Sequence, residues 1–178
     1  MDIERRIEAF DRERIALLDE LASLDPARLT ARSIPGKWSI LEIVEHLVLG
    51  EELVYGGLPD PGQLRQHRRR LKNRFFYLLV MVLLRFGVRL KAPSKALLPR
   101  GEGSFEQYRQ RWDRNQKWLS TYAGSLSPEE LRRAVFIHPA TGPIDVVQVV
   151  DMTAAHFHTH LRQIRALQKL LEEERQAI

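Results

Sequence analysis

Apolar residues recur along most of the chain at intervals of three and four positions, which places them on one face of an α-helix. No stretch shows a sustained alternation of apolar and polar residues next to turn signals of the Asn-Gly kind, as a β-hairpin would. In the first helix the pattern places on the inner face Ile7, Phe10, Ile15, Leu18 and Leu21. The sequence therefore predicts an all-α fold.

Local signals mark where several helices begin. Ser39 with Glu42, and Ser104 with Gln107, have the spacing of a capping box, in which each side chain satisfies a free backbone amide near the helix start. A short helical turn is expected at 127–130, where a proline stands at the first helical position. The expected long helices span residues 2–24, 39–55, 64–90, 104–122 and 145–173.

Length and composition narrow the class of protein. A chain of 178 residues can bury an apolar core as a single domain, so we treat residues 1–178 as one unit. Because the sequence has no cysteine, a zinc-type site must use nitrogen and oxygen ligands. The first nine residues are charged and lack the apolar core of a signal peptide, so we expect a cytoplasmic protein.

Charge is unevenly distributed. Residues 61–100 contain eleven Lys or Arg and no Asp or Glu, which leaves 17 basic and 23 acidic residues elsewhere. The same segment holds a ten-residue apolar run, Phe75 to Leu84, which is shorter than the roughly 20 residues of a membrane-spanning helix. We interpret residues 61–103 as a helical insertion that is basic and apolar.

The insertion allows three interpretations. It could pack against the core or form the interface of a homodimer, residues 65–91 could lie on an anionic membrane surface, or it could bind nucleic acid. We favour the first and expect a homodimer, because a chain of this size can bury such a run against itself or a second copy. Nucleic acid is the least favoured partner because no recognised binding motif accompanies the charge.

Helical geometry separates the histidines. At about 100° per residue, His46 faces inward, and His156 and His160 share one stripe of the last helix. His158 lies about 200° from His156 and should face solvent. The spaced pair could be two separately satisfied core histidines, but a third inward histidine on another helix favours a metal site. We predict one divalent ion, zinc or nickel, bound by His46, His156 and His160.

Other polar residues are candidates for supporting this site. Gln163 shares the histidine stripe and could orient a ligand or a water, although it could equally be a polar residue at the end of the bundle. Asn115 lies among aromatic residues and needs a partner if buried, whereas Glu42 could do no more than cap its helix. Trp38 is expected to pack at the mouth of the bundle, and His67 to lie on a solvated basic face.

Two stretches together resemble the DinB/YfiT-like superfamily. They are residues 36–47, Gly-Lys-Trp-Ser-Ile-Leu-Glu-Ile-Val-Glu-His-Leu, and residues 156–164, His-Phe-His-Thr-His-Leu-Arg-Gln-Ile. His-Pro at 138–139 and Gly-Pro at 142–143 precede the last helix in the same order. The resemblance implies an antiparallel four-helix bundle with a three-histidine metal site at His46, His156 and His160. Residues 63–91 are not part of the motif.

The resemblance also implies a range of functions. Many members have no assigned activity, whereas characterised ones include metal-dependent thiol transferases and mycothiol-dependent isomerases. Three neutral imidazoles leave a fourth coordination position for water or a substrate thiol. We therefore expect an enzyme that transfers a low-molecular-weight thiol to a small molecule or hydrolyses one. A glutamate does not follow His156, so the zinc-protease mechanism is excluded.

The alternative is a protein without catalysis. It would be a metal-binding or dimerisation module, related to stress responses, whose basic segment contacts a partner or a membrane surface.

Overall fold

The computed structural model describes residues 2–88 and 95–176, and the predicted all-α class is confirmed. The part of the expected insertion at 89–94 lies outside the described residues. The α-helices are α1 (Ile3–Ala22), α2 (Pro26–Thr30), α3 (Ile40–Gly56), α4 (Leu71–Arg85), α5 (Phe105–Gly124) and α6 (Val146–Gln176). Between them lie the short 3-10 helices η1 (Pro61–Gln63), η2 (Lys95–Leu97) and η3 (Glu130–Arg132), and the strands β1 (Phe136–His138) and β2 (Gly142–Ile144).

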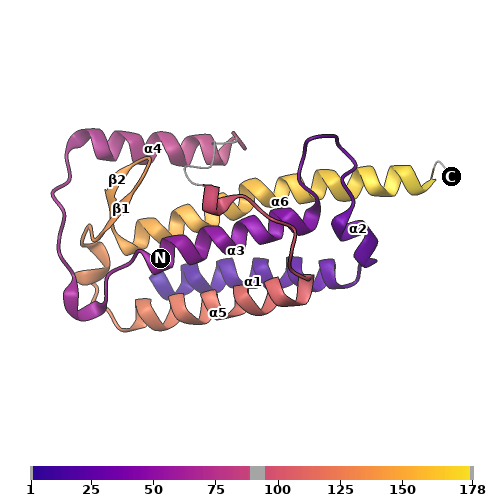
Figure 1. Cartoon of the computed structure of the whole chain (residues 1–178). Helices are drawn as coiled ribbons and strands as arrows, with labels where there is room; N and C mark the ends of the chain where they lie inside the picture. The colour runs from indigo at the N-terminus through magenta and orange to yellow at the C-terminus, as the bar shows by residue number, and fades with distance from the viewer. Residues whose placement is uncertain (1, 89–94, 177–178) are drawn as a thin grey trace.

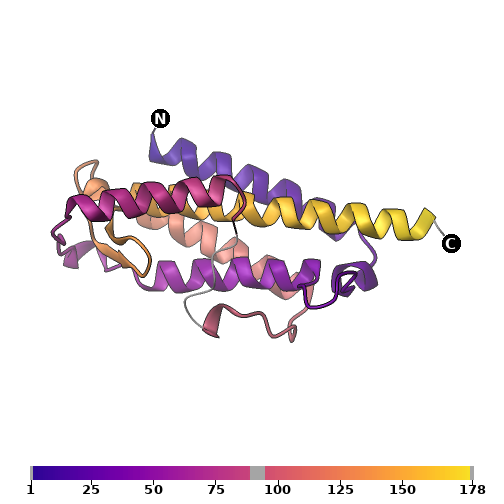
Figure 2. The same cartoon turned by 90° about the horizontal axis from the view of Figure 1, so that it is seen from above.

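Helices α1, α3, α5 and α6 form a four-helix bundle, in which α3 and α1 each contact both α5 and α6 (Figure 1). The neighbouring pairs α1–α5 and α3–α6 are antiparallel, whereas α3 and α5 run in the same direction, as the two views agree (Figures 1 and 2). The reason is α4, which returns the chain along the bundle so that α5 begins at the end where α3 began. The expected antiparallel bundle is thus antiparallel in two of its neighbouring pairs.

Capping side chains fix the helix starts. The Ser39 and Ser104 side chains accept hydrogen bonds from the backbone N–H of Glu42 and Gln107, and both glutamate and glutamine side chains return the bond. At the start of α6, the backbone N–H of Gln148 donates to Asp145 at 2.8 Å. The predicted starts of these three helices are confirmed to within one residue.

The inner face of α1 differs from the expected one at adjacent positions. Ile15 is 41% exposed, while Arg14 is 2% exposed and buried within the bundle. The Arg14 guanidinium donates to Asp11 and Asp113 and lies 5.8 Å from the centre of the Trp112 ring. Burial of this cation is possible because both ion pairs and the ring replace its hydration.

The expected helix at 64–90 is too long at both ends, since α4 spans Leu71–Arg85 and residues 86–88 are not helical. Residues 64–70 have no helical structure, and the backbone N–H of His67 donates to the Ala134 carbonyl at 2.8 Å. Arginines at 65, 68 and 69 would stand three and four residues apart in a helix, where like charges destabilise it. After Arg85, Gly87 has φ of +72°, a conformation that favours glycine and ends α4.

A small β-hairpin precedes α6 and was not expected from the sequence. Its strands pair antiparallel, with Phe136 opposite Ile144 and His138 opposite Gly142. Strands of three residues are too short to produce a recognisable alternation of apolar and polar positions. The hairpin lies between α4 and the start of α6 (Figure 1).

No helix in the described part of the chain combines the length and the apolarity needed to cross a bilayer.

Candidate metal centre

His46 from α3 meets His156 and His160 from α6 inside the bundle. Each offers a ring nitrogen, and these potential ligand atoms lie within 4.8 Å of one another. The Nε2 atoms of His156 and His160 are 3.1 Å apart. Nitrogens bound tetrahedrally at 2.0–2.1 Å would stand about 3.4 Å apart, so the pair on α6 has nearly the spacing that one ion requires. The structure thus brings together all three histidines that the sequence singled out.

Hydrogen bonds orient two of these rings. Nδ1 of His46 lies 2.7 Å from the carbonyl oxygen of Leu97 in η2, and Nδ1 of His160 lies 3.1 Å from Oε1 of Gln163. Since both acceptors are oxygens, each Nδ1 must carry the proton, and each Nε2 keeps a lone pair. This is how metal-binding histidines are commonly held, with one ring nitrogen donating to an oxygen and the other on the ion.

Burial favours the neutral form of two of these histidines. Removal from water lowers the pKa of His46, and the Leu97 carbonyl opposes that shift in part. Burial lowers the pKa of His156 further, well below its usual value, and the neighbouring His160 and His46 add to the effect. A neutral imidazole is the form that binds a metal, so these two rings are prepared for an ion near neutral pH.

The Leu97 carbonyl is held in place by the segment that follows it across α3. Both oxygens of the buried Glu45 carboxylate accept backbone N–H bonds, from Arg100 at 3.0 Å and Gly101 at 2.8 Å. Further along, the backbone N–H of Gly103 donates to the Tyr108 hydroxyl at 2.9 Å. We call residues 95–103 the clasp. It extends over α3 on the side that faces the viewer in Figure 1, and it connects His46 to α5.

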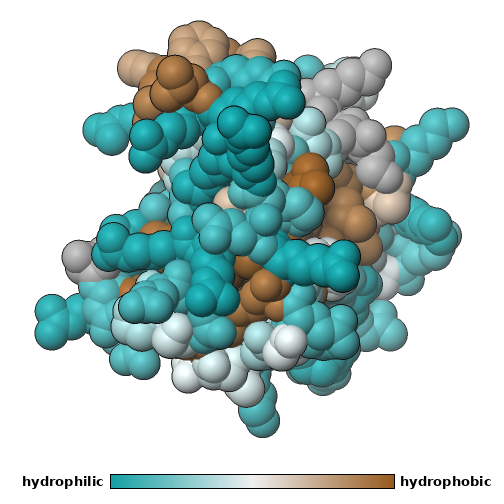
Figure 3. Space-filling view, turned by 90° about the vertical axis from the view of Figure 1, so that its left-hand side faces the viewer, coloured by the Kyte–Doolittle hydropathy of each residue, from teal (hydrophilic) through white to brown (hydrophobic). Residues whose placement is uncertain are grey.

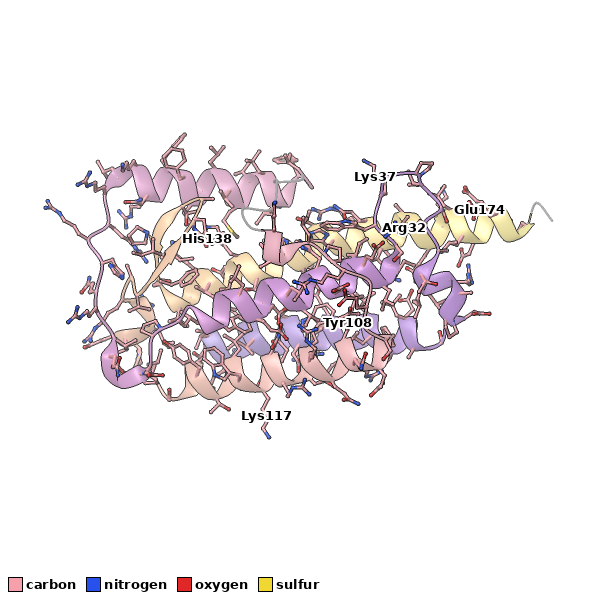
Figure 4. The ribbon with its side chains drawn as sticks, in the orientation of Figure 1. Arg32, Lys37, Tyr108, Lys117, His138 and Glu174 are labelled. Atoms are coloured by element: carbon pink, nitrogen blue, oxygen red, sulfur yellow. The ribbon has the colours of Figure 1, made fainter. Side chains whose placement is uncertain are left out.

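Glycine at 103 allows this close contact without displacement of the Tyr108 ring. A Cβ atom there would lie 2.6 Å from the Tyr108 ring, which is closer than atoms can approach. Figure 4 places Tyr108 on α5 and Arg32 near the end of the bundle where α3 begins, whereas His138 lies toward the other end, below α4. Sequence patterns did not identify the clasp, because backbone acceptors such as Leu97 leave no trace in residue type.

Trp38 contacts the site directly. Its ring centre is 4.8 Å from that of His46 and 6.5 Å from that of His160, and it is nearly parallel to the latter. It was expected at the mouth of the bundle, and its ring forms one wall of the histidine cluster. An aromatic wall of this kind limits the access of water to a bound ion.

The three candidates for supporting residues have different partners in the structure. Gln163 contacts His160, as described above. Asn115 donates to the Val48 carbonyl at 3.3 Å. Its side chain also forms a hydrogen bond with the buried Glu51, which opposes the effect of burial on the pKa of that carboxyl. Glu42 accepts bonds from Ser39 and Arg32, which outweigh its burial and lower its pKa. The structure therefore gives Asn115 and Glu42 partners other than the histidines.

The remaining predicted histidine positions agree with the structure in part. His158 is half-exposed and its Nε2 lies 2.7 Å from Glu13, which agrees with the solvent-facing position expected for it. His67 is partly exposed and borders a basic hollow together with Arg68 and Arg69.

The ligand set fits zinc or nickel better than harder ions. In the described part of the chain, the group of side chains that could hold an ion consists of three histidines and contains no carboxylate. Imidazole suits zinc and nickel, whereas magnesium and calcium prefer oxygen ligands. The residues present thus match a divalent transition metal or zinc.

Comparison with known proteins supports the resemblance that the sequence motifs indicated. The family model for the DinB superfamily matches residues 9–164, which include α3, α5, most of α1, the first part of α6 and all three histidines. Searches of curated proteins and of solved structures returned no significant match. On the strength of the family match, with the three-histidine cluster in agreement, the chain belongs to the DinB superfamily.

Proposed function

We propose that this protein is a metal-dependent enzyme that transfers a low-molecular-weight thiol to a small electrophilic substrate. The observation that carries the proposal is the convergence of three imidazoles on one point, with Nδ1 of His46 and of His160 each engaged by an oxygen. When bound, a zinc or nickel ion would supply a Lewis acid with a fourth position for an exchangeable ligand.

A thiol is favoured over water at that position. Hydrolysis at a metal usually needs a nearby carboxylate to take a proton from water. Among the described residues, the group that could hold the ion consists of histidines and includes no carboxylate. Phe157 stands where the zinc proteases have that glutamate. For a thiol, by contrast, a bound ion would supply the charge that favours the thiolate form, so no carboxylate base is needed, and the thiol proton would pass to solvent. The thiolate sulfur would then form a bond to the electrophilic carbon as the bond from that carbon to its leaving group breaks.

The protein side chains would set the conditions for this step. Leu97 and Gln163 hold the rings of His46 and His160 in the tautomer that exposes Nε2. Trp38 would cover one side of the reacting sulfur and exclude water. Glu45 would act at a distance, because it positions the clasp and thereby the carbonyl that orients His46.

Metal analysis tests the first half of the proposal. Purified protein should carry about one zinc or nickel ion per chain. His46→Ala, His156→Ala and His160→Ala should each lose it, whereas the matched control His158→Ala, on the same helix but half-exposed and outside the cluster, should keep it. Wild-type metal content in His46→Ala would overturn the three-ligand site.

Activity assays test the second half. The metal-loaded protein, its chelated form and His158→Ala should be compared for consumption of glutathione and cysteine with a chloronitrobenzene electrophile, and for ester hydrolysis. We expect metal-dependent thiol consumption. Ester hydrolysis without thiol consumption would favour a hydrolase. Full metal occupancy without any turnover would favour the non-catalytic module.

A further inference from the structure

Helix α4 lies outside the four-helix bundle and packs on it with one face. Val80 and Leu84 are its buried residues, and it contacts α6. Its C-terminal end is fixed there, since the Leu84 carbonyl accepts hydrogen bonds from Thr159 and Arg162 of α6, both at 2.8 Å. At the other end, Asn73 donates to the Thr141 carbonyl of the hairpin. The direction in which the opposite face points is therefore set by the fold.

That opposite face is apolar and exposed. Leu71, Phe75, Leu78 and Phe86, which follows the helix, are each between 61% and 84% exposed, and Leu79 and Val82 are also exposed. At 100° per residue these six side chains fall within an arc of about 100°. Figure 3 shows apolar side chains gathered at the top of the molecule, where α4 lies. A continuous apolar stripe of this kind on a surface indicates an interaction site.

Cations border the stripe on both sides. On the same helical projection, Lys72 follows one edge by about 20°, and Arg85 and Arg74 follow the other edge by about 20° and 40°. All three are exposed. The segment that leads into the helix carries three additional exposed cations, Arg65, Arg68 and Arg70.

Acidic residues do not balance this charge nearby. Residues 61–100 contain none. Asp145 and Asp151, whose charges act on Tyr77 of α4, are already paired with Arg69 and Arg6. A surface that covers the stripe should therefore be apolar in its middle and negatively charged at its border.

We propose that α4 lies in the interface of an anionic membrane, with its outer apolar face among the lipid chains and its bordering cations at the phosphate headgroups. A helix with an apolar face and a basic border binds such a surface through both contributions. The inner face stays on α6, so the helix would bring the bundle to the membrane without unfolding. The proposal does not depend on the metal or on catalysis.

A second copy of the chain matches the same surface less well. If α4 packed against α4 of another molecule about a two-fold axis, the bordering Lys72, Arg74 and Arg85 of one copy would approach those of the other. Like charges at a contact are unfavourable, and residues 61–100 offer no acid to compensate. The dimer expected from the sequence is accordingly the competing outcome of the test below.

Flotation of the full-length protein with vesicles distinguishes these cases. Wild type should float with vesicles in which about a third of the lipid is phosphatidylglycerol and stay behind with vesicles of phosphatidylcholine alone. The triple variant Lys72→Glu/Arg74→Glu/Arg85→Glu should bind the anionic vesicles at least about a hundredfold more weakly. Phe75→Ser/Leu78→Ser should also lose binding, since it removes two of the most exposed apolar side chains.

Matched control variants test whether vesicle binding depends on α4 or on exposed cations and apolar side chains anywhere on the surface. Lys117→Glu reverses an exposed cation on the far side of the bundle from α4 (Figure 4), and Leu53→Ser/Ile15→Ser removes two exposed apolar side chains of α3 and α1. Both should bind as wild type does, and circular dichroism should show that every variant is folded.

Three results would overturn the proposal. The first is wild type that fails to float with anionic vesicles. The second is a dimer in sedimentation that Phe75→Ser/Leu78→Ser dissociates, which would assign the face to a second copy. The third is vesicle binding lost in the charge variant but unchanged in the serine variant, which would show attraction by charge alone.

Discussion

Glu51 is a buried ionisable residue in the middle of the bundle, on α3. Its two carboxyl oxygens accept hydrogen bonds from Nε1 of Trp112 at 2.7 Å and Nε2 of Gln116 at 2.8 Å. Burial raises the pKa of Glu51 to about 8, although these bonds and the charge of Arg14 oppose the shift. Glu51 is therefore protonated in the folded protein at neutral pH.

A protonated Glu51 must donate as well as accept. In the described structure the buried Oε1 of Gln116 has no hydrogen-bond partner. If the Gln116 amide turns by a half rotation, this oxygen can accept the carboxyl proton. The same arrangement suits a glutamine at position 51, because its amide can donate where the carboxyl proton does.

Glu51→Gln should remove a pH-dependent loss of stability. In the wild type, the unfolded chain releases the Glu51 proton above its usual pKa of 4.5 while the folded chain holds it up to about 8. Stability thus falls by about 1.4 kcal/mol per pH unit across that window and levels off above it. Relative to wild type, the variant should gain about 3 kcal/mol in free energy of unfolding between pH 5 and pH 8, measured by urea titration.

The control for this prediction is the next residue. Glu52 is half-exposed and pairs with Arg111 at 2.6 Å, so Glu52→Gln should leave the pH dependence as it is in wild type. If Glu51→Gln and wild type show parallel stability curves from pH 5 to 8, the carboxyl is ionised in the folded state and this account of the bundle interior is wrong.

Residue type and helical position gave conflicting information on α1. Periodicity places position 14 closer to the middle of the inner face than position 15, yet an isoleucine at 15 and an arginine at 14 suggested the opposite. Arg14 is buried because Asp113 comes from a different helix, α5. A partner 99 residues away in sequence cannot be found from the spacing along one helix.

Elements with local signals were predictable from the sequence. The three capping pairs, Ser39 with Glu42, Ser104 with Gln107, and Asp145 with Gln148, act within one turn, so their spacing alone marks the helix starts. Helical spacing also placed the histidines inward. The clasp and the hairpin were not predictable, because they are held by backbone atoms and by contacts between segments distant in sequence.

The clasp offers a test of how an element outside the ligand set supports the site. Glu45→Gln keeps the size of the side chain but replaces one acceptor oxygen by a donor, which faces a backbone N–H of Arg100 or Gly101. The clasp should loosen, and His46 should lose the Leu97 carbonyl that orients it. We expect zinc affinity, measured by competition with a chelating dye, to fall about tenfold.

A matched variant lies in the clasp itself. Glu102→Gln makes the same change of charge at an exposed residue, so it should keep wild-type affinity. Equal affinities of Glu45→Gln and wild type would show that the orientation of His46 does not depend on the clasp.

The three-histidine cluster occupies a small part of a molecule that has its own core. Apolar side chains fill the bundle in two clusters, one around Trp112 and Phe157 and the other around Leu119 and Val149, and neither cluster includes a histidine of the candidate site. A chain of 178 residues buries enough apolar surface to fold without a metal, unlike small zinc-stabilised domains. The site is thus built onto a stable scaffold.

Removal of the metal should therefore leave the fold intact but alter its dependence on pH. After treatment with a chelator, we expect unchanged helical circular dichroism and cooperative thermal unfolding, with a lower melting temperature because bound metal stabilises the folded state. In the metal-free protein, burial lowers the pKa of His46 and His156, so the unfolded chain binds protons first as the pH falls. Stability should then decrease below about pH 6.5. His46→Ala/His156→Ala should decrease less steeply over the same range. Loss of helical signal on chelation at pH 7.5 would show instead that the ion holds the bundle together.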